Sequence, residues 1–201
     1  SLVASGFADA SDLQFRGVRL HSLSATFGWL GGSRPQLSLQ VLADTIASGR
    51  LVATNARVGA LGSSESLRWT GSFEVSEGAA FGAAGRFASQ DHASSLAIDS
   101  LSMALPGHLW RLLEPAVAQT TDSGTVLSPL RLESVDGSGA IRMGGVLPGD
   151  RPGNLRVDAY GLDLRDVSGL LRGDTAGVSG SIGAALEITG TRQAPIIQGT
   201  A

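Results

Sequence analysis

The stretch Leu67-Arg68-Trp69-Thr70-Gly71-Ser72-Phe73-Glu74-Val75-Ser76 alternates apolar and polar side chains along its length. Successive residues of a β-strand point to opposite faces of a sheet, so this alternation predicts a strand with one apolar and one polar face. Leu67, Trp69, Phe73 and Val75 share the apolar face. The stretch therefore indicates a β-sheet that is dry on one side and wet on the other.

The same alternation recurs through most of the chain. It is clear in Leu37–Val41, and again from Val178 to Thr189, where Val178, Ile182, Leu186 and Ile188 share one face. Segments rich in glycine and proline at residues 31–35, 136–139, 148–153 and 192–195 separate the runs and predict turns. We therefore expect an all-β fold with more than about ten strands.

Two of the runs change phase midway. Leu96 and Ile98 lie on one phase, whereas Leu101 and Met103 lie on the other. The run that begins at residues 155–159 gives way in the same manner to Leu162. One extra residue in a strand turns every later side chain to the opposite face, so each change predicts a bulge or a bend.

Residues 107–119 form the one window with helical spacing. Leu109, Leu112, Leu113 and Ala116 fit one face of a helix, but Pro115 interrupts the pattern. A short helix and an irregular loop are both open here. Because a polar segment follows, we expect a weak internal break near residues 117–125 within a single β-rich region spanning residues 1–201.

Composition excludes several classes of function. The chain has 201 residues, of which 42% are hydrophobic and 16% charged, and its net charge is -3. The basic residues are scattered singly, which argues against a nucleic-acid partner. The absence of cysteine excludes disulfides and thiolate metal sites, and no apolar run reaches the roughly 18 residues of a membrane span. Both ends are typical of a segment of a longer chain.

No catalytic constellation is apparent. His21, His92 and His108 are far apart, lack metal-binding spacing and are interpreted as surface residues. The nucleophile motif Gly-x-Ser-x-Gly is absent. The dispersed acidic residues fit solvated strand faces, and Trp110 among leucines fits packing better than a ligand platform. We therefore expect no enzymatic activity, no metal and no cofactor.

The apolar strand face is the one feature that indicates a function. We predict that it forms a continuous surface in contact with lipid. Its candidate residues are Leu37, Leu39, Val41, Leu67, Trp69, Phe73, Val75, Val178, Ile182, Leu186 and Ile188. Such a face can seal a sandwich, close a barrel or line a groove, and periodicity alone does not choose among these arrangements.

Two segments carry a family resemblance. Residues 177–199 resemble the recurring unit of TamB and AsmA-like proteins, in which a strand is followed by Gly-Thr, three residues, Pro and another strand. The stretch Trp110-Arg111-Leu112-Leu113-Glu114-Pro115, with Val126–Ser134 and Leu162-Asp163-Leu164, is similar to a second TamB element. Together the two segments cover roughly residues 100–201, and residues 1–99 match in style alone.

The resemblance implies a long antiparallel or mixed sheet folded like a taco around an apolar groove. It implies a periplasmic segment of a protein anchored in the inner membrane, whose partners are phospholipid acyl chains and an outer-membrane barrel of the Omp85 type. The implied roles are phospholipid transport between the two membranes and support of outer-membrane protein assembly. A β-sandwich is the alternative fold. The alternative functions are a β-helical adhesin or passenger, a structural interaction module, and an enzyme on a sandwich.

Overall fold

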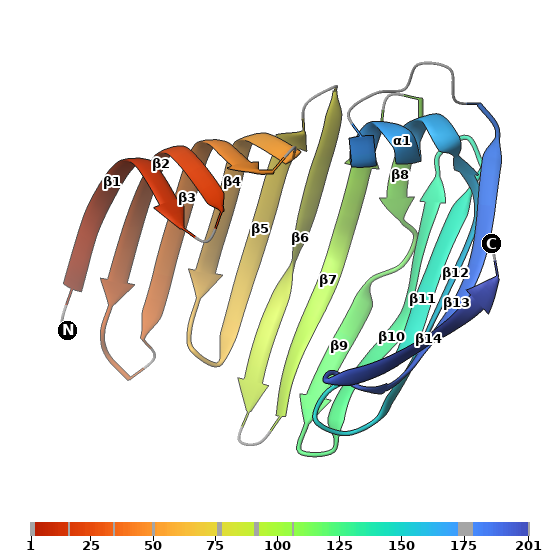
Figure 1. Cartoon of the computed structure of the whole chain (residues 1–201). Helices are drawn as coiled ribbons and strands as arrows, with labels where there is room; N and C mark the ends of the chain where they lie inside the picture. The colour runs from red at the N-terminus through yellow and green to blue at the C-terminus, as the bar shows by residue number, and fades with distance from the viewer. Residues whose placement is uncertain are drawn as a thin grey trace.

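The chain folds into one antiparallel sheet of fourteen strands with a single short helix among the residues that are described (Figure 1). The computed structural model describes residues 3–15, 17–33, 35–49, 51–75, 78–90, 93–105, 107–172 and 179–200. The strands are β1 Val3–Phe15, β2 Val18–Leu30, β3 Gln36–Ser48, β4 Leu51–Gly62, β5 Ser66–Val75, β6 Ala79–Gln90, β7 Ala93–Ala104, β8 Leu109–Leu112, β9 Ala116–Thr121, β10 Gly124–Ser134, β11 Ala140–Leu147, β12 Gly153–Asp163, β13 Ser181–Thr191 and β14 Ala194–Thr200. The predicted all-β fold is confirmed, and the strands form one sheet rather than the two of a sandwich.

The sheet is a meander in which each strand pairs with its neighbours in sequence. β8 and β9 are the exception, because both lie between β7 and β10 and together fill one strand position. The helix considered for residues 107–119 is therefore wrong. The chain bends at Leu113–Pro115, and this break mimics helical spacing by placing Leu112 and Ala116 on the same face of the sheet. Residues 117–125 run inside the sheet, along β9 and its hairpin to β10.

Both predicted phase changes coincide with irregularities in the strand register. The pairing of β6 with β7 shifts between Ala84 and Gly85, leaving Asp99 as the extra residue of β7. The pairing of β12 with β13 shifts between Ala159 and Leu162, where Gly161 has a φ of 63°. Each bulge returns the apolar residues that follow it to the face they would otherwise leave.

The first five strands bend together near one end of the sheet (Figure 1). Asp12 in β1 and Asn55 in β4 both have a φ of 53°, in the left-handed region that Asn and Asp tolerate better than other side chains. A His21 ring nitrogen lies 3.1 Å from the Asp12 carboxylate, and the Asn55 amide donates to Glu74 at 2.8 Å. Side-chain contacts on neighbouring strands thus accompany the bend.

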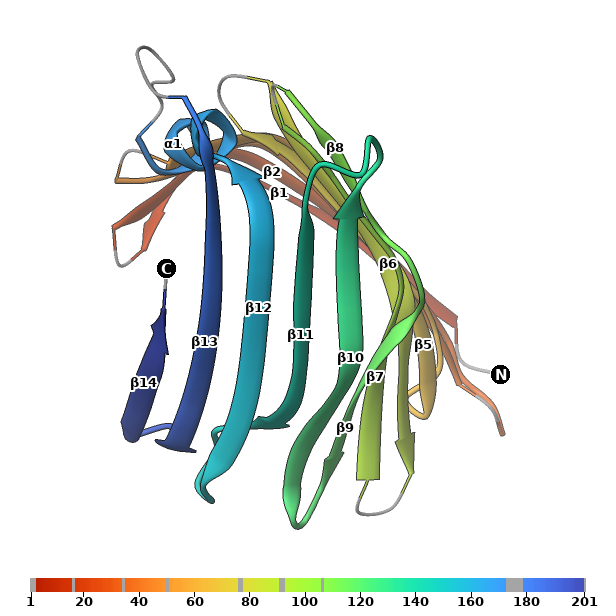
Figure 2. The same cartoon turned by 90° about the vertical axis from the view of Figure 1, so that its right-hand side faces the viewer.

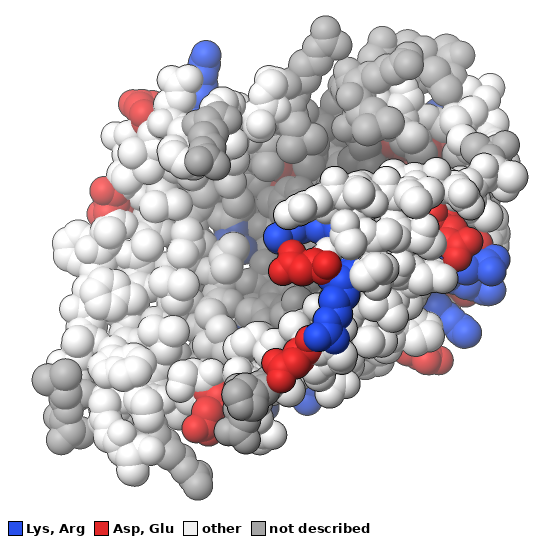
Figure 3. Space-filling view, turned by 60° about the horizontal axis from the view of Figure 1, so that its bottom comes forward, with Lys and Arg blue, Asp and Glu red and all other residues white. Residues whose placement is uncertain are grey.

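The whole sheet curls so that its two halves face each other across a hollow (Figures 2 and 3). We call β1–β6 the N-terminal wall, β7–β10 the crease and β11–β14 the C-terminal wall. A buried cluster of Trp110, Ala116, Leu130 and Leu132 fills the crease. Partly buried residues from β7 to β12 pack against it, and strands so far apart in the sheet can meet only on its concave side.

The helix α1, Leu164–Arg172, follows β12 and lies across the upper end of the curled sheet (Figures 1 and 2). Asp163 begins it by accepting a hydrogen bond from the Arg165 backbone N–H at 2.8 Å, as an N-cap residue does. The signals for this helix are Asp163 and the spacing of Leu164 and Val167. In the part of the chain that is described, no helix is long and apolar enough to cross a bilayer.

Candidate functional site: the concave apolar face

One row of residues crosses the sheet on a single face, because residues directly opposite each other on paired strands share a face. It runs from β3 to β13 without a charged residue. Its members, each paired with the next, are Leu37, Gly62, Leu67, Phe87, Leu96, Ala118, Leu127, Gly145, Leu155 and Ile188. Its member Ala118 lies two residues from Ala116 of the buried cluster on β9, so the row shares the concave face with that cluster.

The structure places the candidates that it describes on this same face. Leu37, Leu67 and Ile188 belong to the row itself. The other described candidates share this face for one of two reasons. Either they lie an even number of residues from a row member on a regular stretch of strand, or they pair with a residue that does. They are Leu39, Val41, Trp69, Phe73, Val75, Leu186 and Ile182. Ile182 pairs with Leu162 beyond the bulge of β12. Val178 lies outside the described residues.

Burial divides the concave face into a closed part and an open part. In the crease, Trp110 is 2% exposed and Leu132 is 6% exposed. On the N-terminal wall, Phe73 is 38% exposed and Val58 is 49% exposed. Most of the described candidates are half-buried, whereas Val75 is buried. A contiguous exposed apolar patch marks a surface that binds something apolar.

Aromatic rings lie flat on this face because glycines stand beneath them. A Cβ added at Gly85 would approach the Trp69 ring to 2.8 Å, and one added at Gly6 would approach the Phe27 ring to 2.6 Å. In the crease, a Cβ at Gly139 would meet the Trp110 ring at 2.7 Å. Each ring therefore occupies space that a side chain on the neighbouring strand would fill, which keeps the face shallow.

An apolar pocket of about 540 Å³ lies on the N-terminal wall and reaches Leu101 of β7. The stacked rings of Phe73 and Phe81, with centroids 4.8 Å apart, contribute to it. Its lining is Ile46, Ala53, Ala56, Arg57, Val58, Gly71, Ser72, Phe73, Phe81, Gly82, Ala83 and Leu101. The volume falls in the range of small-molecule sites, which are mostly apolar with few polar groups.

The opposite, convex face carries paired charges. Arg86 donates two hydrogen bonds to Asp99, at 2.8 and 2.9 Å, and this pairing lowers the pKa of Asp99. Arg156 makes a similar contact with Asp158 at 2.8 Å. Figure 3 shows acidic and basic side chains interspersed on one side of the molecule. The convex face also has exposed apolar residues, among them Phe7, which is 78% exposed.

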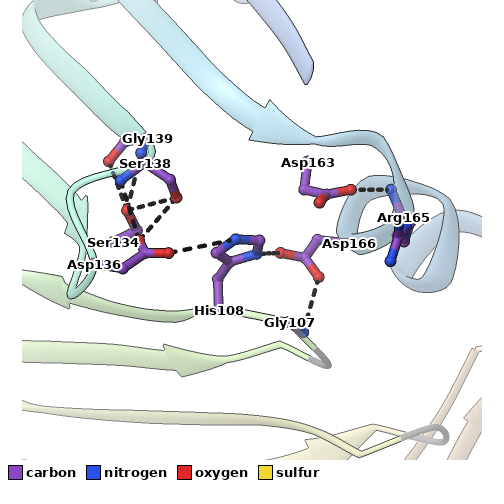
Figure 4. Close-up of polar contacts among 9 residues, drawn as sticks. All are labelled: Gly107, His108, Ser134, Asp136, Ser138, Gly139, Asp163, Arg165 and Asp166. Carbon is purple, nitrogen blue, oxygen red and sulfur yellow. Dashed lines mark hydrogen bonds and ion pairs between the residues drawn. The ribbon is translucent and has the colours of Figure 1, made fainter. Parts of the chain in front are cut away.

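A second polar cluster lies at the upper end of the crease (Figure 4). His108 Nδ1 donates to the Asp166 carboxylate at 2.7 Å, and His108 Nε2 lies 3.6 Å from Asp136. The side chain of His108 is 18% exposed and that of Asp166 is 4% exposed. The interpretation of His108 as a surface residue is therefore wrong. No sequence signal could have joined the three residues, because they come from separate loops and a helix.

Among the described residues, no three His, Cys, Asp or Glu side chains gather where they could hold a metal ion. The indole Nε1 atoms of Trp69 and Trp110 are buried and have no hydrogen-bond partner in the described structure. Trp110 is a packing residue of the crease, as the sequence favoured.

Comparisons with models of protein families, with curated proteins and with solved structures found no match.

Proposed function

We propose that the concave apolar face binds the acyl chains of phospholipids. The observation that supports this is the uncharged row that crosses the sheet from Leu37 to Ile188 while Phe73 and Val58 stay exposed beside it. A sealed core would bury these side chains. An exposed apolar strip with charged residues on the reverse side suits a ligand that is long, flexible and apolar.

The chemistry of the face fits acyl chains in energy and in specificity. Each methylene transferred from water to an apolar surface contributes about 0.8 kcal/mol, so one chain lying along several strands gains substantial affinity without any hydrogen bond. The rings over Gly6 and Gly85 leave a shallow track rather than a fitted pocket. Such a track binds chains of differing length, while a polar headgroup stays in water.

In the cell, we propose that the chain is a periplasmic segment of an inner-membrane-anchored protein that passes phospholipid to the outer membrane. It would also support outer-membrane protein assembly through an Omp85-type barrel. The resemblance of residues 100–201 to TamB and AsmA-like repeats supports this part of the proposal. No catalytic step belongs to it. The alternative of a β-helix gains no support, because the strands of the sheet pair antiparallel.

The test uses photo-crosslinking amino acids at adjacent positions of β5. Positions 69 and 73 lie on the concave face, and positions 68 and 74 on the same strand point to the convex face. With phospholipid vesicles, we expect lipid adducts at the first pair and not at the second. Native mass spectrometry of the unmodified chain should show bound phospholipid. Equal adducts at all four positions, or none at any, would refute the proposal.

A further inference from the structure

The helix α1 lies across the upper end of the curled sheet. Leu162, which packs against the buried cluster of the crease, lies two residues before the first residue of α1. Leu105 also packs against that cluster and precedes the loop that carries His108. In Figures 1 and 2 the helix lies at the upper strand ends, beside β12 and near β8. The end of the apolar face therefore lies beside α1.

A helix of this length depends on its anchors. α1 has nine residues, and isolated helices shorter than about 12–15 residues are marginal in water. Asp163 caps its start, and the Leu164 backbone N–H donates to Gly180 at 2.9 Å. A further anchor is Asp166, whose buried carboxylate accepts from His108 and, more weakly at 3.4 Å, from the Gly107 N–H. A buried carboxylate is costly unless it is paired.

We propose that α1 is a cap on one end of the apolar face and that His108 is its pH-dependent latch. A protonated His108 bridges Asp166 on the helix and Asp136 on the β10–β11 turn, joining the cap to the crease. A neutral His108 still donates from Nδ1 to Asp166, but its Nε2 then presents a lone pair to the Asp136 carboxylate. Deprotonation thus weakens the hold on α1 and frees the end of the face.

The three carboxylates near His108 all raise its pKa. The hydrogen bond to Asp166 raises the pKa of His108, burial opposes this, and the charges of Asp166, Asp136 and Asp163 raise it further. The ordinary value is about 6.5. Because the folded pKa is raised, the latch is at full strength below about pH 6.5 and is lost as the pH rises through the folded value. The cap is therefore held in mild acid and loosened in alkali.

The experiment compares the titration of His108 with the opening of α1 in the 201-residue chain. The His108 pKa is measured by NMR, and the opening of residues 164–168 by hydrogen exchange corrected for its intrinsic pH dependence. By linkage, opening must increase about tenfold for every pKa unit by which the capped state exceeds the open state. H108Q should remove the pH dependence of α1 opening, and its opening constant should match that of the wild type with a neutral His108. D136N should lower the pH at which the cap opens, with Asp166 untouched.

An opening constant that is unchanged with pH, or that changes equally in β3 and β4, would overturn the cap. The inference rests on the proposed function only in taking the apolar face beside α1 as a lipid-binding surface. The same samples are therefore also mixed with phosphatidylglycerol vesicles. Opening with pH but no bound lipid at any pH would support the cap and refute the proposed function. Lipid binding without any change in the opening of α1 would refute the cap and support the proposed function.

Discussion

Two aspartate substitutions on the same face should have very different effects on stability. Phe73 is 38% exposed on the N-terminal wall, and Leu132 is 6% exposed in the crease. Phe73→Asp loses the stacked pair with Phe81 and part of its apolar burial, together about 1–2 kcal/mol. Leu132→Asp places a carboxylate in the buried cluster, at a cost of about 4 kcal/mol or more.

Thermal melts followed by circular dichroism measure this contrast. For a chain of this size, 1 kcal/mol corresponds to a change in Tm of about 2–4 °C. Phe73→Asp should therefore lower the Tm by about 2–8 °C and keep the fold, while Leu132→Asp should lower it by at least about 8 °C or prevent folding. If Leu132→Asp cannot be purified, Leu132→Ala should still cost about 2–5 kcal/mol.

The same variants separate stability from binding. Phe73→Asp keeps the sheet but puts a charge where an acyl chain would lie, so phospholipid binding should fall strongly. Phe73→Leu, which keeps an apolar side chain, is the matched control and should bind nearly as the wild type does. If Phe73→Asp unfolds the chain as completely as Leu132→Asp, the face around Phe73 is a closed core and the reasoning fails.

Two further predictions concern glycine packing and a carboxylate. Gly85→Ala should lower stability by about 1–3 kcal/mol because its Cβ would clash with the Ala97 carbonyl oxygen, whereas Gly71→Ala on the adjacent strand, whose nearest atom is 4.0 Å away, should leave the Tm nearly unchanged. The backbone N–H of Ser138 is the main cause that lowers the pKa of Asp136 to about 2, so the ¹³C shift of the Asp136 carboxyl should titrate near that pH. The stabilising effect of the ionised carboxylate should be complete above about pH 4 and should be lost as the pH falls through the folded pKa. Ser138→Ala keeps this backbone N–H and removes the hydroxyl that also donates to Asp136 at 2.8 Å, so it should raise the pKa only part of the way. An unchanged titration would contradict the contribution of the hydroxyl.

The strands were predictable because alternation is a local property of the sequence. A sheet with one dry face requires apolar residues at every second position, and Leu67–Val75 meets this requirement directly. The bulges were predictable for the same reason. Leu96 and Leu101 reach one face only if an extra residue lies between them, and Asp99 is that residue.

Features that depend on distant residues could not be predicted in this way. The window 107–119 has helical spacing, yet β7 and β10 supply backbone partners on both sides and make it two strands. The His108 cluster depends on how the β10–β11 turn and α1 meet at one end of the sheet, which periodicity does not encode. α1 itself carried an N-cap signal at Asp163, but the alternation of β12 that precedes it hid the change of period.

The curvature of the sheet and the pairing of large with small residues together explain why one face is both core and open surface. Across the walls, a large side chain commonly stands opposite a small one: Trp69 opposite Gly85, and Leu155 opposite Gly145. Such pairs form a thin apolar layer that cannot reach across the hollow to the other wall. In the crease the strands turn sharply, so Leu132 and Trp110 can meet residues of β7 and β12 and become buried. The same apolar pattern therefore stabilises the fold where the sheet is tightly curved and leaves a binding surface where it is not.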